Sequence, residues 1–187
     1  EACTLQLDAP SVIWLASCEL LAQSHAQPNV LIFMADTLRL DFLHCYNFPL
    51  ETSPSIDAFA ADAVKFWRLC PPSSWTRPSV GTLFTGVSRN LHTAQDGDNA
   101  IREDLPTIFN SFVENGLETA AFISNPNCLP YFGFGRGLER LVHTEIEEGA
   151  MSWREDIHAT DLAIEAIENA VGRPWSVYLH LMGPHDP

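Results

Sequence analysis

The chain has 187 residues, of which 46% are hydrophobic, so it can bury a substantial core and is not a disordered chain. Its 24 acidic and 10 basic residues give a net charge of −14, which argues against nucleic acid or an anionic membrane as a partner. The five cysteines are odd in number and form no CxxC pair, which predicts neither a disulfide framework nor a structural zinc site.

No apolar run is long enough to span a bilayer. The longest one near the N-terminus, residues 11–17, is followed by Glu19. We therefore expect no membrane-spanning segment. Residues 1–27 show no regular apolar pattern and are assigned to an N-terminal segment, whereas residues 28–187 are assigned to one domain.

The first half of the domain contains two predicted strands and two predicted helices. The continuous apolar run Val30–Ala35 predicts a strand covered on both faces. Residues 54–64 are expected to form a helix, because a serine followed by a proline is typical of a helix start. A short strand is expected around residues 65–69. Residues 78–86 then predict a helix that opens on a proline and stops at a glycine.

The second half repeats this alternation. Asp104 is expected to cap a helix that runs from Leu105 until Gly116 ends it, and residues 119–123 predict the next buried strand. Apolar spacing over residues 157–171 predicts the helix with the clearest helical pattern, and residues 175–181 predict the last strand. The alternation predicts an α/β domain whose mostly parallel sheet is flanked by helices, with ligands at the carboxyl ends of the strands.

Three polar residues stand where this architecture would place a site. Asp36 follows the first strand and could hold a divalent cation through oxygen. Thr76 precedes a helix N-terminus, which favours anions, and its hydroxyl could act as a nucleophile once a metal activates it. His185 follows the last strand and could donate to an anionic oxygen or protonate a leaving group.

Each of these residues also has a plainer interpretation. Asp36 could cap the next turn, Thr76 could be only the N-cap of its helix, and His185 could be a turn residue. Position alone does not decide between the two interpretations.

The order of the motifs decides it, because together they resemble the sulfatase family of the alkaline phosphatase superfamily. The resemblance extends from about Pro28 to Pro187. The matching segments are Pro28–Arg39, Cys45–Tyr46, Thr52–Asp57, Ser74–Ser79, Leu83–Gly86, Thr119–Phe122 and Tyr178–Pro187. Each segment is weakly specific, and the specificity lies in their combination and order.

The resemblance implies an alkaline-phosphatase-like fold and hydrolysis or transfer at sulfate or phosphate esters. It aligns Asp36 with the family's first metal-binding aspartate and His185 with the histidine that contacts the substrate's anionic group. It aligns Thr76 with the Cys or Ser that sulfatases oxidise to formylglycine. A threonine cannot become formylglycine, and Val80 stands in place of the motif arginine. In both departures the chain resembles other branches of the superfamily, such as phosphodiesterases and phosphoglycerol transferases. In those branches an unmodified Thr attacks phosphorus and binds the metal.

Two further residues are candidates for binding the anionic ester. Arg77 could clamp an anionic oxygen, although an arginine in an exposed loop is often only solvated. Asn125 stands where the family has an anion-binding Lys and His, and it would be a weak substitute. Residues 133–137 are predicted to form a turn rather than a nucleotide loop, and the acidic residues 145–148 a solvated edge.

The resemblance also implies a divalent metal ion, with calcium, zinc and manganese left open. The family's remaining metal ligands, an Asp followed by Asn or His, lie beyond the Pro-His motif. We therefore expect residues 28–187 to be the N-terminal portion of a catalytic domain, an incomplete fold that binds metal poorly and is inactive in isolation. The alternative is a catalytically inactive, sulfatase-like binding module, which downstream sequence would distinguish.

Overall fold

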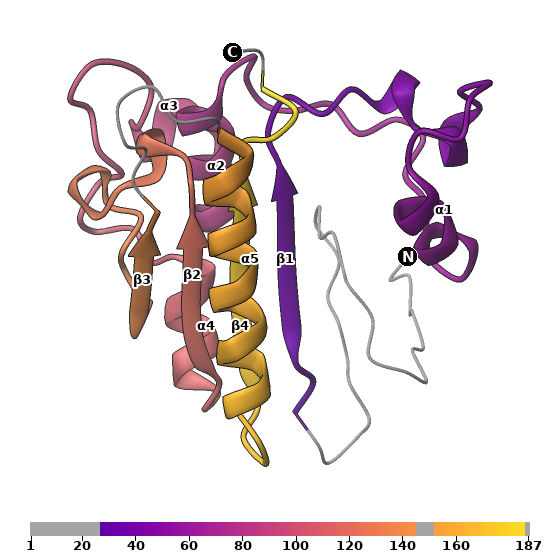
Figure 1. Ribbon diagram of the computed structural model, residues 1–187. Coiled ribbons are helices and arrows are strands. Elements are labelled where there is room, and N and C mark those ends of the chain that lie inside the picture. Colours follow the sequence, from indigo (N-terminus) through magenta and orange to yellow (C-terminus); the bar gives the residue numbers. More distant parts are fainter. Residues whose placement is uncertain (1–26, 145–151, 186–187) are drawn as a thin grey trace, which may run out of the picture.

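The computed structural model describes residues 27–144 and 152–185, and a parallel sheet lies at its centre (Figure 1). The strands are β1 (Val30–Ala35), β2 (Glu118–Ile123), β3 (Arg140–His143) and β4 (Trp175–Leu181), in the order β1-β4-β2-β3. All three neighbouring pairs are parallel. The sheet confirms the predicted α/β fold, and it brings the carboxyl ends of β1, β2 and β4 to one edge.

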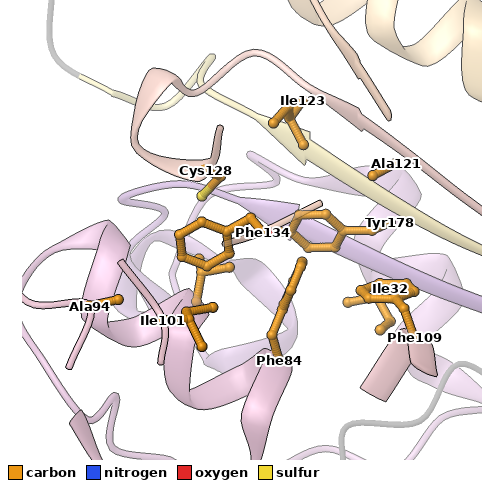
Figure 2. Close-up of a cluster of buried hydrophobic side chains, with 11 residues drawn as sticks. Ile32, Phe84, Ala94, Ile101, Phe109, Ala121, Ile123, Cys128, Phe134 and Tyr178 are labelled. Atoms are coloured by element: carbon orange, nitrogen blue, oxygen red, sulfur yellow. The ribbon is translucent and has the colours of Figure 1, made fainter. Parts of the chain in front are cut away.

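One face of the sheet is covered by α2 (Thr76–Thr85) and α4 (Ile108–Glu114), and aromatic rings fill the space beneath them (Figure 2). The centroid of the Phe84 ring lies 4.9 Å from that of Phe109 and 5.1 Å from that of Tyr178, with the rings edge to face. Such pairs add about 0.5–1.5 kcal/mol each beyond their burial. The cluster therefore holds α2 firmly against the sheet.

The other face is covered by α5 (Ser152–Asn169), which lies along the sheet in Figure 1. Ala159 and Ala163, one helical turn apart, belong to the same buried cluster as Val177 and Leu179 of β4. Small side chains let the helix approach the strand closely. Because β4 alternates between the two cores, it is buried on both faces, as its apolar sequence predicts.

The short strand predicted around residues 65–69 is wrong. These residues form turns and irregular backbone, and the Trp67 side chain packs edge-on against Tyr46 at a centroid distance of 5.2 Å. Bulky residues favour a strand only where a neighbouring strand offers a surface to pack on, and none lies here in the described part of the chain. The sequence also missed β3, which is a short edge strand with no long apolar run.

The cap predicted at Asp104 is also wrong. α4 begins at Ile108, and Thr107 caps it through reciprocal hydrogen bonds with Asn110. Pro106 explains the shift, because the residue before a proline is sterically kept out of the helical conformation.

The remaining helical segments are short: α1 (Pro54–Ala61), α3 (Arg89–His92), η1 (Leu40–Phe42), η2 (His44–Tyr46), η3 (Pro126–Cys128) and η4 (Pro130–Phe132). α1 thus ends before the predicted Val64. Residues 133–137 form the predicted turn, in which Gly133 and Gly137 have φ values of +87° and +75°. The acidic residues 145–148 lie outside the described residues. Within residues 27–144 and 152–185, no helix combines the length and hydropathy needed to cross a bilayer.

Candidate active site

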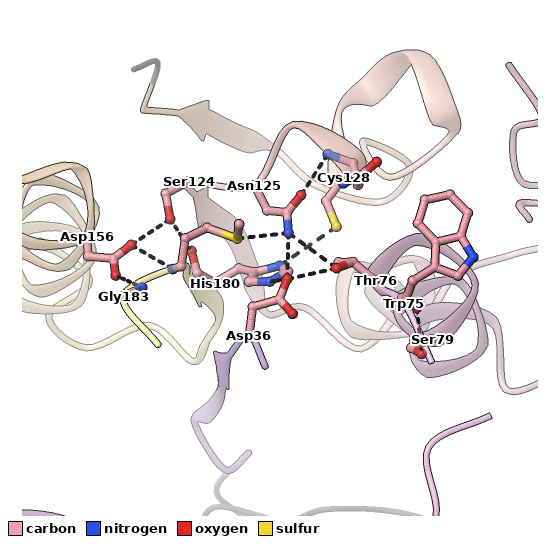
Figure 3. Close-up of polar contacts among 12 residues, drawn as sticks. Asp36, Trp75, Thr76, Ser79, Ser124, Asn125, Cys128, Asp156, His180 and Gly183 are labelled. Atoms are coloured by element: carbon pink, nitrogen blue, oxygen red, sulfur yellow. Dashed lines mark hydrogen bonds and ion pairs between the residues drawn. The ribbon is translucent and has the colours of Figure 1, made fainter. Parts of the chain in front are cut away.

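The carboxylate of Asp36, directly after β1, is the centre of a polar cluster (Figure 3). Its Oδ2 atom accepts hydrogen bonds from Thr76 Oγ1 at 2.8 Å and from Asn125 Nδ2 at 2.6 Å, and it lies 3.2 Å from His180 Nε2. The partners come from α2, from the loop after β2 and from β4. The fold thus brings together three residues predicted for the site, Asp36, Thr76 and Asn125.

Two opposing effects set the pKa of Asp36. Burial, the largest single effect, raises the pKa, whereas hydrogen bonds with His180, Thr76 and Asn125 and the electrostatic interaction with the His180 ring lower it. The lowering effects together win, so the pKa lies below its ordinary value. The carboxylate is therefore ionised near neutral pH and acts as an acceptor.

The backbone turns sharply after Asp36. Thr37 has a φ of +55°, in the left-handed region that a β-branched residue rarely adopts. The Asp36 N–H still donates to Leu181 O at 2.9 Å and so continues the ladder between β1 and β4. A residue in such a conformation costs about 1–3 kcal/mol, and this kind of strain clusters at functional sites.

Thr76 is the first residue of α2, and Trp75 occupies the capping position. The interpretation of Thr76 as the N-cap is therefore wrong, since its hydroxyl donates across the site to Asp36. This puts a hydroxyl and an ionised carboxylate in direct contact at the N-terminus of a helix, whose partial positive charge favours the anion.

Asn125 is fully buried, and both ends of its side-chain amide have partners. Its Oδ1 accepts from Asn127 N at 2.8 Å, which identifies the other end as Nδ2. Nδ2 donates to Asp36 and contacts Met182 Sδ at 3.0 Å. Asn125 therefore presents N–H groups to the cluster, as an anion ligand requires, whereas a cation ligand would present oxygen.

His180 is the member of the cluster that the sequence analysis did not single out. It is fully buried in β4, and its Nδ1 lies 2.9 Å from Tyr178 OH. Because an ionised carboxylate only accepts, Nε2 carries the proton toward Asp36 and Nδ1 accepts from Tyr178. Burial raises the pKa of Tyr178, which keeps the phenol protonated as a donor. A histidine inside an apolar strand was the available signal, since a buried imidazole needs polar partners.

Cys128 borders the same histidine, with its Sγ 3.7 Å from His180 Nδ1. Burial raises the pKa of this thiol, so it is neutral. Within the described residues, Cys45, Cys70 and Cys128 are free thiols.

Arg77 is buried in α2 rather than exposed in a loop. Its guanidinium donates to Gly97 O and, at 3.4 Å, to Asn127 Oδ1, and it lies over the Phe132 ring at 3.4 Å from the centroid. These contacts hold Arg77 beside the loop that contains Asn125. Its role in binding an anion stays a prediction.

His185 lies in the exposed turn after β4. Its backbone N–H donates to Met182 O at 2.8 Å, and Met182 in turn contacts Asn125 through sulfur. The turn that carries His185 therefore starts beside the cluster. Contact between His185 and a substrate stays a prediction.

The oxygen atoms of Asp36 and Thr76 are the kind of ligand that a hard divalent cation prefers. Among residues 27–144 and 152–185, no group of three His, Cys, Asp or Glu side chains is arranged to hold a metal. The donor chemistry thus fits a cation, but these residues supply only one charged ligand.

Known proteins share both the sequence pattern and the fold. The model of the sulfatase family matches residues 28–187. Human arylsulfatase A is 35% identical over 80 residues, covering 43% of this chain and 16% of that protein. The N-acetylglucosamine-6-O-sulfatase of Bacteroides thetaiotaomicron is 23% identical over 185 residues, covering 91% of this chain and 33% of that protein.

A solved structure has the same fold. The phosphonate monoester hydrolase of Agrobacterium radiobacter superimposes with a TM-score of 0.68 at 21% identity, covering 86% of this chain and 42% of that one. The chain thus spans less than half the length of each of these relatives.

Proposed function

Because the chain belongs to the sulfatase family, as its motifs predict, we propose that its protein is a metal-dependent hydrolase or transferase of sulfate or phosphate esters with Thr76 as nucleophile. The observation that carries this proposal is the 2.8 Å hydrogen bond from Thr76 Oγ1 to Asp36 Oδ2. An attacking hydroxyl needs a neighbour that orients its proton, and an ionised carboxylate does so.

Asp36 and Thr76 would also supply two of the ligands of a divalent cation. Within the described structure, the three hydrogen bonds of the Asp36 side chain all end on Oδ2. Oδ1 is therefore left to bind a cation. When bound, the cation lowers the pKa of the Thr76 hydroxyl and offsets charge on the ester. One carboxylate and one hydroxyl bind such a cation weakly, so the remaining ligands are expected from other parts of the protein.

The chemical step proceeds by two displacements. The Thr76 oxygen bonds to the sulfur or phosphorus as the bond to the alcohol oxygen breaks, and the Thr76 proton leaves through the hydrogen bond it already makes. His185 gives a proton to the departing alcohol. Water or an acceptor hydroxyl then attacks the Thr76 ester and gives its proton to His185, while the departing Thr76 oxygen takes its proton back from Asp36.

Anion recognition falls to N–H donors. Asn125 Nδ2 already faces Thr76 Oγ1 at 3.5 Å, so it is close to where the transferred group would be attached. Arg77, on α2, donates to Asn127 Oδ1, two residues further along the same loop. Donors fixed in a buried site stabilise developing negative charge better than water does, because they need not reorient.

The test uses the complete gene product with aryl sulfates, aryl phosphates and phosphonate monoesters, in the presence of calcium, zinc or manganese. Thr76→Ala is expected to lower turnover at least about 10³-fold, whereas Thr76→Ser retains part of it. Equal turnover in the Ala variant would overturn the nucleophile assignment. The substrate that is turned over fastest identifies the ester, and the cation that supports the highest turnover identifies the metal.

A catalytically inactive binding module is the second candidate. It is favoured by Thr76 in place of a formylglycine precursor and by Val80 in place of the motif arginine. This candidate predicts that the protein binds an anionic ester without turnover, and that Thr76→Ala leaves the affinity unchanged.

A further inference from the structure

The carboxylate of Asp156, on α5, connects two strand ends (Figure 3). Its Oδ1 accepts from Ser124 Oγ at 2.7 Å and from Met182 N at 2.8 Å, and its Oδ2 accepts from Gly183 N. Ser124 follows β2, and Met182 and Gly183 follow β4. One buried side chain thus satisfies a hydroxyl and two consecutive backbone amides.

These partners directly precede residues of the proposed active site. Ser124 is followed by Asn125, and Gly183 is followed by Pro184 and His185. Past the end of β4 the amides of Met182 and Gly183 leave the sheet ladder, and a carboxylate binds such amides more strongly than a neutral acceptor does.

The site fits a carboxylate and little else. An asparagine would turn one acceptor oxygen into an NH₂ group facing a backbone N–H or a hydroxyl. At residue 183, a Cβ atom would lie 2.8 Å from Asp156 Oδ2, so the strand end can approach the carboxylate only because Gly183 has no side chain. Asp156 and Gly183 thus fit each other, since the carboxylate needs the backbone N–H of residue 183 and the approach leaves no room for a Cβ atom there.

We propose that Asp156 is a positioning residue for the active site, which holds the His185 turn and the start of the Asn125 loop in register with each other. This inference rests on the proposed function. Asp156 acts through the backbone of residues 182–183 and through Ser124, and its loss is expected to misplace His185 first, because two of its three bonds hold that turn.

The test compares Asp156→Asn with Glu155→Gln in the complete gene product. Glu155 is the matched control, since it is adjacent and buried, and its Oε2 has no hydrogen-bond partner in the described structure. Hydrogen exchange at the amides of Met182 and Gly183 is expected to rise in the Asp156 variant and to stay unchanged in the control. Equal exchange in the two variants would overturn the proposed hydrogen bonding.

Kinetics separate positioning from a general loss of stability. In Asp156→Asn, kcat/KM is expected to fall about 10–100-fold, as is typical when a residue that orients a ligand is lost. The loss should grow with the pKa of the leaving alcohol, because His185 supplies its proton. A loss equal for all leaving groups, or no loss, would contradict the positioning role.

Gly183→Ala serves as a second variant if Asp156→Asn does not fold, since its Cβ displaces the carboxylate without removing it. It is expected to show the same dependence on the leaving group, and a uniform effect would again contradict the proposal. Thr76→Ala, measured in parallel, distinguishes the two hypotheses. If it abolishes turnover while the Asp156 variants do not change the dependence on the leaving group, only the positioning role fails. If it leaves turnover intact, the proposed function fails.

Discussion

His180 Nε2 lies 3.2 Å from Asp36 Oδ2, although 144 residues separate the two in the sequence. The other ring nitrogen is held by Tyr178 OH at 2.9 Å, so the imidazole cannot rotate without losing a buried hydrogen bond. His180 therefore fixes the orientation in which the Asp36 carboxylate accepts from Thr76.

Replacing His180 with phenylalanine tests this relationship. The phenylalanine ring fills a similar volume, but Asp36 keeps only its hydrogen bonds from Thr76 and Asn125, and the Tyr178 hydroxyl loses its His180 partner. Leaving the buried hydroxyl unpaired is expected to lower the free energy of unfolding by about 1–3 kcal/mol. Turnover by the complete gene product should fall as well, because Asp36 is no longer oriented. Urea denaturation and steady-state kinetics measure the two effects. His158→Gln serves as the control, because His158 is exposed. Equal unfolding free energies and equal turnover in the two variants would refute the role assigned to His180.

The predicted alternation of strands and helices placed Asp36, Thr76 and His185 at one edge of a parallel sheet, and Asn125 was added by the resemblance to the sulfatase family. The structure brings Asp36, Thr76 and Asn125 into contact. A histidine inside an apolar strand indicates a buried imidazole with a polar partner, but the sequence could not predict that the partner of His180 is Asp36, because the pairing of β1 with β4 sets that contact. The register Met34↔His180 puts the imidazole next to the end of β1, and tertiary structure alone defines that register.

The failed strand at residues 65–69 and the missed β3 have the same origin. Lys65–Leu69 has a suitable composition but no neighbouring strand, whereas Arg140–His143 pairs with β2 despite its weak pattern. Strand formation depends on the partner more than on local preference.

The buried His92 predicts a pH dependence of stability. Its Nδ1 accepts from Ala94 N at 3.2 Å, so the ring is neutral with its proton on Nε2, 3.1 Å from Thr82 Oγ1. Burial lowers the pKa of His92, and hydrogen bonds involving the backbone offset this only in part.

Because the folded pKa of His92 lies below the unfolded value of 6.5, the unfolded chain gains a proton first as the pH falls. The free energy of unfolding is therefore expected to drop between pH 6.5 and the lowered folded pKa, and to be unaffected by this group above that range. His92→Gln should flatten the pH dependence in urea denaturation. A slope identical to that of the parent protein would show that His92 does not contribute.

The aromatic cluster predicts where the core is least tolerant. Phe84 is buried and contacts the rings of Phe109, Phe134 and Tyr178, so Phe84→Ala is expected to cost about 3–5 kcal/mol of unfolding free energy. Phe59→Ala on α1 is the matched control, since that ring is 56% exposed, and it should change stability by at most about 0.5 kcal/mol. Similar losses in the two variants would contradict the assigned core.

In the proposed function, Thr76 carries the transferred group during turnover. Acid quenching of the complete gene product with an aryl phosphate or sulfate, followed by mass spectrometry of its peptides, tests this directly. We expect a phosphoryl or sulfuryl group on the Thr76 side chain, and no such group in the Thr76→Ala variant. Turnover with the group on another side chain, or turnover by the Ala variant, would contradict it.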